Sequence, residues 1–180
     1  IKLLFLLKVI FATMMAFYIG SIALFLIDLF DFNEKELGMF MFVVGIFLSF
    51  NQAFLSKKVI AKIGEFNTLK VGLACSFVGL FCITLTDHLW LFIAFYYILN
   101  LGLSLTFPTF NSLISIHADP KKQGEIMGIS DSLNSLAMAL FPVVAAAAYG
   151  LIEYKLYYLM SALPFLALVI AVIKGKRAGL

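Results

Sequence analysis

Charged side chains are scarce in this sequence: Asp, Glu, Lys and Arg make up 13% of its 180 residues, while 63% are apolar. A soluble domain has about 25% charged and about 45–50% apolar residues. The composition therefore excludes an ordinary soluble domain and predicts a membrane protein. The net charge of +3 is small, and no basic run alternates with aromatic residues, which argues against nucleic acid as a partner.

Residues that carry enzyme or metal chemistry are also rare. The two histidines, His88 and His117, lie in polar breaks at opposite faces of the predicted membrane. The sequence contains no HExxH or GxSxG motif and no paired acids within an apolar run. The two cysteines, Cys75 and Cys82, share a helix face without a neighbouring His or carboxylate, so we expect them to pack as small apolar residues. We therefore predict no enzyme activity, no metal site and no cofactor.

Long apolar runs make up most of the chain. A helix needs about 20 apolar residues to cross a hydrocarbon core of about 30 Å, and six runs meet this length. They cover approximately residues 9–30, 37–55, 68–86, 89–114, 125–149 and 155–173. The predicted fold class is all-α, a polytopic membrane protein with six transmembrane helices.

Basic residues are distributed unevenly between the breaks. When the breaks are assigned alternately to the two membrane sides, Lys35 and Lys155 fall on one side and all other Lys and Arg residues on the other. The second group comprises Lys2, Lys8, Lys57, Lys58, Lys62, Lys70, Lys121, Lys122, Lys174, Lys176 and Arg177. Cytoplasmic loops are enriched in Lys and Arg, so both termini are predicted to be cytoplasmic.

Polar residues follow helical stripes on only four of the six predicted helices. Helices one, two, four and five carry polar, glycine or aromatic residues at steps of three or four. Helices three and six are nearly free of such stripes. The order polar, polar, apolar thus occurs twice, with the two units running in opposite directions. This order predicts two inverted three-helix repeats, an arrangement found within each half of many transporters.

The stripes of helices one and four predict a solute cavity. Polar residues avoid hydrocarbon, so these stripes are expected to face protein or water. The candidate cavity residues are Phe17, Ser21, Tyr96, Asn100, Ser104 and Phe107. Asn51 and Gln52 of helix two either bind solute or form hydrogen bonds between helices, and Tyr96 and Asn100 are the better candidates for solute contact.

Two acids are candidates for proton coupling or gating, and several small residues are candidates for close helix packing. Asp131 and Asp28 either take part in proton coupling or gating, or are interfacial acids that meet water. Helices two and five carry a second kind of stripe, which includes Gly45, Gln52, Gly124, Gly128 and Ser135. Small residues let helix backbones approach closely. The glycines could pack helix five on helix two within this chain or meet another unit.

Two segments resemble a known transporter family. QAFLSKKVIAKIGEFNTLKVG, residues 52–72, is similar to the loop between the second and third helices of the C-terminal half in the major facilitator superfamily. Residues 102–142 resemble the tenth and eleventh helices of that family. The matching positions are Gln52, Lys62, Gly64, Gly72, Gly102, Pro108, Gln123, Gly124, Gly128 and Pro142. The resemblance is greatest to drug:proton antiporters of the tetracycline-efflux type.

The resemblance implies that residues 1–180 form the C-terminal six-helix half of a secondary transporter working by alternating access. Helices one and four would line the cavity. Helices two and five, with Gly45, Gln52, Gly124, Gly128 and Ser135, would face the N-terminal six-helix half. Helices three and six would face the lipid bilayer, here expected to be the inner (plasma) membrane of a bacterium. The implied activity is transport of a small solute, with efflux and proton coupling left open.

A different class of function also fits the composition. The chain could be a complete small six-helix membrane protein that acts as a channel subunit or an assembly scaffold. The full reading frame distinguishes the two hypotheses, because only the transporter hypothesis requires a second six-helix unit upstream.

Overall fold

The computed structural model describes the backbone of residues 1–178 and the side chains of residues 1–175, and all secondary-structure elements in this part of the chain are helices. The side chains of Lys176 and Arg177 lie outside the described part. The elements are α1 (Lys2–Phe30), α2 (Glu34–Phe50), the π-helical turn η1 (Asn51–Leu55), α3 (Ser56–Ile63), α4 (Glu65–Cys82), the 3₁₀ turn η2 (Ile83–Leu85), α5 (Leu89–Ile116), α6 (Gln123–Ile152) and α7 (Lys155–Ala178).

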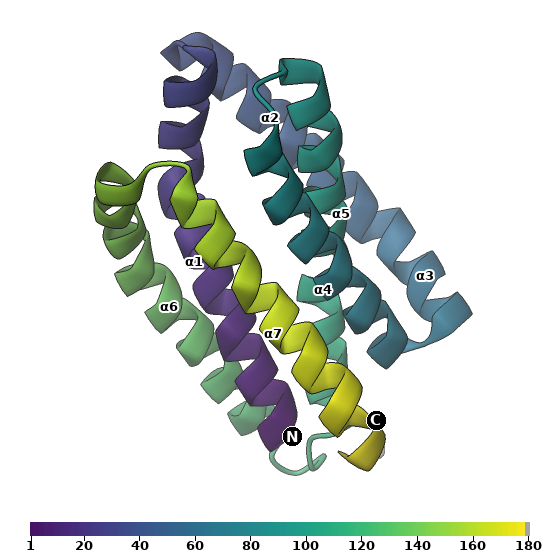
Figure 1. The fold of residues 1–180 in the computed structure, drawn as a ribbon. Coiled ribbons are helices and arrows are strands. Elements are labelled where there is room, and N and C mark those ends of the chain that lie inside the picture. The colour runs from purple at the N-terminus through teal and green to yellow at the C-terminus, as the bar shows by residue number, and fades with distance from the viewer. Residues whose placement is uncertain (179–180) are drawn as a thin grey trace.

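Six helical segments are long and apolar enough to cross a membrane, which confirms the predicted fold class. They are α1, the continuous stretch Glu34–Ile63, the stretch Glu65–Leu85, α5, α6 and α7. The segments run up and down through one bundle, and the N- and C-termini lie at the same end (Figure 1). An even number of crossings requires this placement. Which side of the membrane that end faces stays a prediction.

Burial differs strongly between the helices, in an order that occurs twice along the chain. In the most apolar window of each segment, 50% of α1, 6% of Glu34–Ile63 and 44% of Glu65–Leu85 is buried; the next three segments give 50%, 17% and 39%. The same order in both sets of three helices is what two related three-helix units would produce. The low buried shares of 6% and 17% single out the segment Glu34–Ile63 and α6 as the parts that the described chain leaves largely uncovered.

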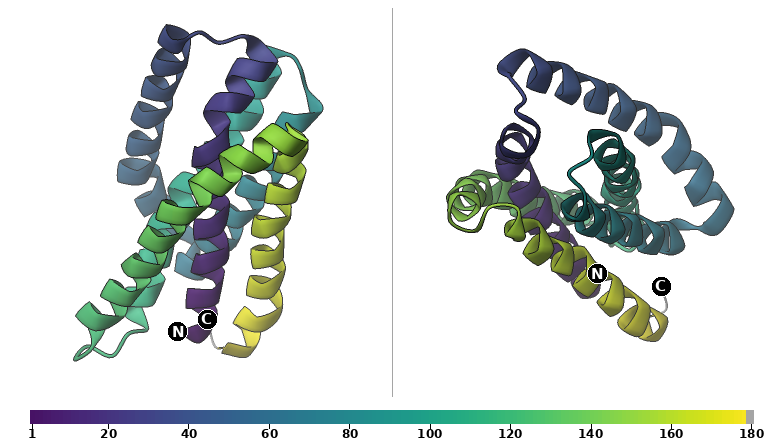
Figure 2. Two further views of the ribbon diagram at one scale, coloured as in Figure 1. Left: turned by 90° about the vertical axis from the view of Figure 1, so that its left-hand side faces the viewer. Right: turned by 45° about the horizontal axis from the view of Figure 1, so that its top comes forward.

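The helix contacts explain these differences in burial. α4 packs along α5, α1 packs along α6, and α7 lies against both α4 and α1. Within residues 1–178, α2 and α6 do not contact each other. They run along opposite edges of the bundle (Figure 1), and Figure 2 shows α2 standing at its margin. Each therefore presents a long apolar face that the described part of the chain does not cover.

Glycines bring α4 and α5 into close contact. A Cβ atom at Gly102 would lie 2.5 Å from the Ser76 backbone nitrogen, and one at Gly79 would lie 2.5 Å from the Leu99 Cα atom. Real Cβ contacts are never this short, so the backbones can approach only because both positions are glycine. The pair α4–α5 is thus a rigid part of the bundle that positions the side chains of α5.

Several helices extend beyond the predicted apolar runs. α1 begins at Lys2 rather than at residue 9, and α6 spans Gln123–Ile152 rather than 125–149. The largest correction concerns residues 56–63, predicted as loop, which continue the second crossing as α3. α3 is amphipathic: Lys57, Lys58 and Lys62 are exposed, while Val59 and Ile60 are half-buried. Hydropathy marks the lipid-embedded part of a helix, whereas backbone hydrogen bonding continues into water.

Candidate functional site

A cluster of hydroxyl and aromatic side chains lies between α1, α5 and α7. The hydroxyl groups of Tyr18 and Tyr96 are hydrogen-bonded to each other. Ser21 Oγ donates to the Phe17 carbonyl oxygen at 2.8 Å and contacts the Tyr157 hydroxyl at 3.2 Å. The structure therefore brings the predicted cavity residues Ser21 and Tyr96 into one polar cluster in the bundle interior.

Asn100 belongs to the same cluster and has spare hydrogen-bonding capacity. Its Nδ2 donates to the Tyr96 carbonyl oxygen at 2.8 Å. Its Oδ1 atom is buried and has no hydrogen-bond partner among the described residues. Buried amide oxygens are normally satisfied, so Asn100 offers an acceptor for a water molecule or a solute donor.

The other three predicted cavity residues lie apart from this cluster. Phe17 is half-buried, with its ring centroid 5.7 Å from that of Phe141. Ser104 is fully buried, and its carbonyl oxygen accepts a 2.8 Å hydrogen bond from Ser56 Oγ. Phe107 is 37% exposed. The six residues thus do not form a single wall in this chain, and their contact with solute stays a prediction.

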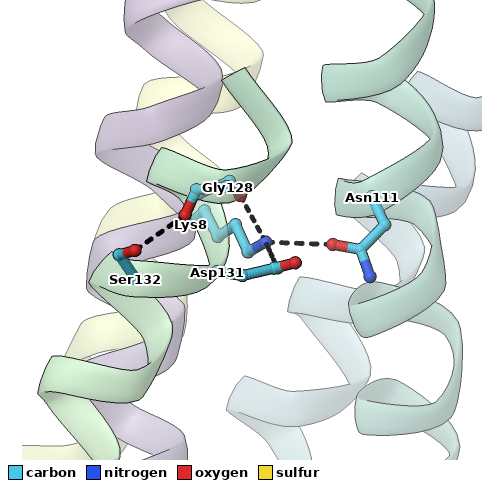
Figure 3. Close-up of polar contacts among 6 residues, drawn as sticks. Lys8, Asn111, Gly128, Asp131 and Ser132 are labelled. Atoms are coloured by element: carbon cyan, nitrogen blue, oxygen red, sulfur yellow. Dashed lines mark hydrogen bonds and ion pairs between the residues drawn. The ribbon is translucent and has the colours of Figure 1, made fainter. Parts of the chain in front are cut away.

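A buried lysine forms a second polar cluster near the end of the bundle where the chain begins (Figure 3). The Lys8 ammonium on α1 donates to Asn111 Oδ1 on α5 at 2.9 Å and to Ser130 Oγ on α6 at 2.5 Å. It also lies 3.5 Å from Oδ1 of Asp131. The Lys8 side chain is 6% exposed and that of Asp131 is 68% exposed. The cation is therefore enclosed, while its carboxylate partner faces outward from α6.

This role of Lys8 was not predicted from the sequence, where Lys8 counted only among the flanking basic residues. A usable signal is present in the spacing. Lys8, Ala12, Ala16 and Gly20 follow one another at steps of four and so share one face of α1, and all but the half-buried Gly20 are buried. A small-residue face marks close helix packing, so a lysine on that face points toward the neighbouring helix.

The two candidate acids have different surroundings. Asp131 is an exposed acid on α6, paired with Lys8. Asp28 is exposed near the opposite end of the bundle, where it lines an open cavity of about 530 Å³ together with Asp31, Tyr149 and Glu153. Roles in coupling or gating stay predictions for both. Across the residues that the structure describes, no group of three His, Cys, Asp or Glu side chains could hold a metal ion.

The predicted interface residues all lie on exposed helix faces. Gly45, Gln52, Gly124, Gly128 and Ser135 are exposed. No atom of the described chain lies within 4 Å of a Cβ built at Gly45, Gly124 or Gly128. The alternative that these glycines pack helix five on helix two within this chain is therefore wrong. Close packing instead uses Gly20, Gly72, Gly79 and Gly102.

Comparison with known proteins identifies the family. The sequence profile of the Major Facilitator Superfamily matches residues 2–142. The chain belongs to the major facilitator superfamily. This confirms the family resemblance drawn from the segments 52–72 and 102–142, and it makes the six apolar helices those of a membrane protein.

Individual relatives of this superfamily chain match it over most of its length. The "Tetracycline resistance protein, class H" of Pasteurella multocida is 27% identical over 151 residues, which is 82% of this chain and 38% of that protein. "Hippocampus abundant transcript 1 protein" of Homo sapiens is 27% identical over 145 residues, or 81% of this chain and 29% of that protein.

A solved structure shares the fold. The crystal structure of the human organic anion transporter MFSD10 (TETRAN) superposes with a TM-score of 0.86 at 20% sequence identity. The superposition covers 94% of this chain and 40% of that structure. The superfamily chain thus spans well under half the length of each of these three proteins.

Proposed function

We propose that this chain is the C-terminal six-helix half of a secondary active transporter that moves a small solute by alternating access. The uncovered faces of α2 and α6 carry this proposal. Their exposed apolar side chains include Phe42, Ile46, Phe50, Leu133, Leu136 and Leu140. The matched proteins are more than twice as long as the matched region, which leaves chain length for a second six-helix unit on these faces.

The solute proposed is a small organic molecule with polar and aromatic parts. The Tyr18–Tyr96 pair supplies hydroxyl groups, Asn100 supplies an unpaired acceptor, and the Phe40 ring lies 5.0 Å from that of Tyr96. Aromatic rings bind flat apolar surfaces, and a few polar groups fix their orientation. The names of relatives that transport organic anions or confer tetracycline resistance fit this solute class, and efflux is the direction proposed.

Alternating access would arise from rocking of two six-helix halves about this cluster. The start of α6 at Gly124 and Gly128 offers a side-chain-free surface and unpaired N–H groups of a helix end to the second half. Asp131 is proposed as a proton-sensitive element of that contact. Asp28, near the opposite end of the bundle, is the second candidate for proton coupling or gating. Both termini are placed in the cytoplasm and the protein in the inner membrane of a bacterium. The family points to a transporter rather than an enzyme.

Flux through the full-length protein tests this function. The protein is reconstituted into liposomes, and entry of tetracycline and of a carboxylate dye is measured with and without an imposed pH gradient. A transporter gives saturable flux that preloaded solute on the far side accelerates. Flux that rises linearly with concentration indicates a channel subunit, and absence of flux for both probes together with no second six-helix unit indicates a scaffold.

A further inference from the structure

The Lys8 ammonium joins three helices with no donor left over. An ammonium group has three N–H donors, and its neighbours are Asn111 Oδ1 at 2.9 Å, Ser130 Oγ at 2.5 Å and Asp131 Oδ1 at 3.5 Å. Asn111 belongs to α5, and Ser130 and Asp131 belong to α6; Figure 3 shows Asn111 and Asp131 on either side of the ammonium. The cation is therefore attached more firmly to α6 than to α5.

α1 and α6 are also held together farther along. Gly20 lies against Pro142, and these residues are each twelve positions after Lys8 and Ser130. At 1.5 Å of rise per residue this is about 18 Å along both helices, so α1 and α6 run parallel in one register. α5, in contrast, packs mainly along α4. The bundle thus contains an α1–α6 pair and an α4–α5 pair, with α7 lying against α1 and α4. The Lys8–Asn111 hydrogen bond crosses between the two pairs.

We propose that Lys8 is a gating residue whose hydrogen bond to Asn111 closes the seam between these two pairs at the end of the bundle that holds the termini. This inference rests on the proposed transport function. When the bond opens, the ammonium keeps Ser130 and Asp131 as partners, so no unpaired cation is left in the apolar interior. Opening therefore breaks this charge-assisted hydrogen bond together with the 2.5 Å hydrogen bond from Gln123 Nε2 of α6 to Ser115 Oγ of α5. Loss of the charge-assisted bond alone shifts a two-state equilibrium on the order of ten- to a hundredfold.

A reporter cysteine near Lys8 tests the gate. Met127, one helical turn before Ser130 and Asp131 on α6, is half-buried against the bundle core. In the full-length protein, Met127→Cys is combined with Cys75→Ser, Cys82→Ser and replacement of any other cysteine. The measurement is the rate of labelling by a membrane-impermeant thiol reagent added on each side in turn.

Two substitutions of Asn111 should change the labelling rate of the reporter cysteine in opposite directions. Asn111→Leu removes the acceptor and should raise labelling from the side of the termini roughly tenfold, whereas Asn111→Asp gives the ammonium a charged acceptor and should lower it. Ser112→Leu, at the next position of α5, is the control and should change neither rate. Lys8→Met should resemble Asn111→Leu, and Lys8→Arg should stay close to the unaltered protein.

Each outcome decides between a gate and a packing role. Changes of the same sign in Asn111→Leu and Asn111→Asp, or no change in either, overturn the gating role. If the Lys8→Met variant does not fold, the two Asn111 variants still distinguish a gating role from a packing role. An unaltered protein that labels from one side only, whatever the conditions, contradicts alternating access itself. A protein that alternates normally in all variants contradicts only the inference about Lys8.

Discussion

Gly20 of α1 lies directly against the backbone of Pro142 of α6: a Cβ atom at position 20 would come within 2.6 Å of the Pro142 Cα atom. The contact lets α1 and α6 approach closely enough for Lys8 to reach Ser130 and Asp131 on the same helix. Sequence periodicity marked small residues on helix five as close-packing, whereas the close contact between α1 and α6 uses a glycine of helix one.

Gly20→Ala should therefore destabilise the protein. The added methyl group has no room and must push the two helices apart, which typically costs about 1–3 kcal/mol. Gly150→Ala is the matched control, since no described atom lies within 4 Å of a Cβ at Gly150. The measurement is the midpoint of thermal unfolding of the full-length protein in detergent. Equal midpoints for the two variants would show that α1 and α6 are not in close contact at this point.

Asn100→Leu should reduce transport while leaving expression near normal. The substitution removes the buried acceptor Oδ1 that has no partner among the described residues, and one lost hydrogen bond to solute lowers transport by about tenfold. Asn67→Leu, at an exposed position of α4, is the control. Unchanged solute flux in Asn100→Leu would mean that α5 supplies no solute contact at this position.

Gly128→Leu should bias the full-length protein toward the state that is open to the cytoplasm. A bulky side chain on this exposed face hinders the approach of a second half at the start of α6. Accessibility of cavity cysteines from the two sides reports the bias, with Ile129→Leu as a control on the same helix. A variant that folds and inserts but shows unchanged sidedness argues that the glycine has no part in a cytoplasmic contact.

Asp131→Asn should uncouple solute flux from the pH gradient if Asp131 responds to protons. The substitution keeps the size of the side chain but removes the titratable group. Downhill solute flux should persist, and its several-fold stimulation by an imposed pH gradient should be lost. Asp119→Asn, at an exposed loop position, controls for surface charge. Undiminished stimulation in Asp131→Asn would assign Asp131 a purely structural role as the partner of Lys8.

Cysteine labelling tests the membrane orientation. Cysteines at Glu34 and Glu153, which are exposed at one end of the bundle, should react with an impermeant reagent added outside the cell. A cysteine at Lys121 should not react until the membrane is opened. The reverse pattern would invert the topology that the distribution of Lys and Arg predicts.

The number and type of helices follow from the sequence, because the bilayer thickness fixes the length of an apolar spanning segment and few backbone structures can cross the hydrocarbon. That Ser21, Tyr96 and Asn100 face the bundle interior could also be predicted, since polar residues within apolar runs are costly and therefore informative; their contact with solute stays a prediction. Their grouping with Tyr18 and Tyr157 could not be predicted, because periodicity shows which residues share a helix face but not which helix packs against that face.

Other features left weaker signals in the sequence. Lys8 was assigned to a flank because counting charges along loops ignores which face a residue occupies. α3 was missed because hydropathy falls where the helix leaves the hydrocarbon, although the chain continues to hydrogen-bond as a helix through the π-helical turn at residues 51–55. The packing glycines could not be told from the exposed ones, because Gly72 and Gly79 of α4, which pack closely, have the same seven-residue spacing as the exposed Gly38 and Gly45 of α2.

Distances across the full-length protein test alternating access itself. Spin labels at Lys121, at the end with the termini, and at Glu153, at the opposite end, are each paired with a label on the facing loop of the second six-helix unit. Alternating access predicts two distance populations at each end, with the Lys121 pair far apart when the Glu153 pair is close, and their ratio shifts when solute is added. A single fixed distance at both ends, or no second unit to carry the labels, would contradict the proposal that this chain is half of such a transporter.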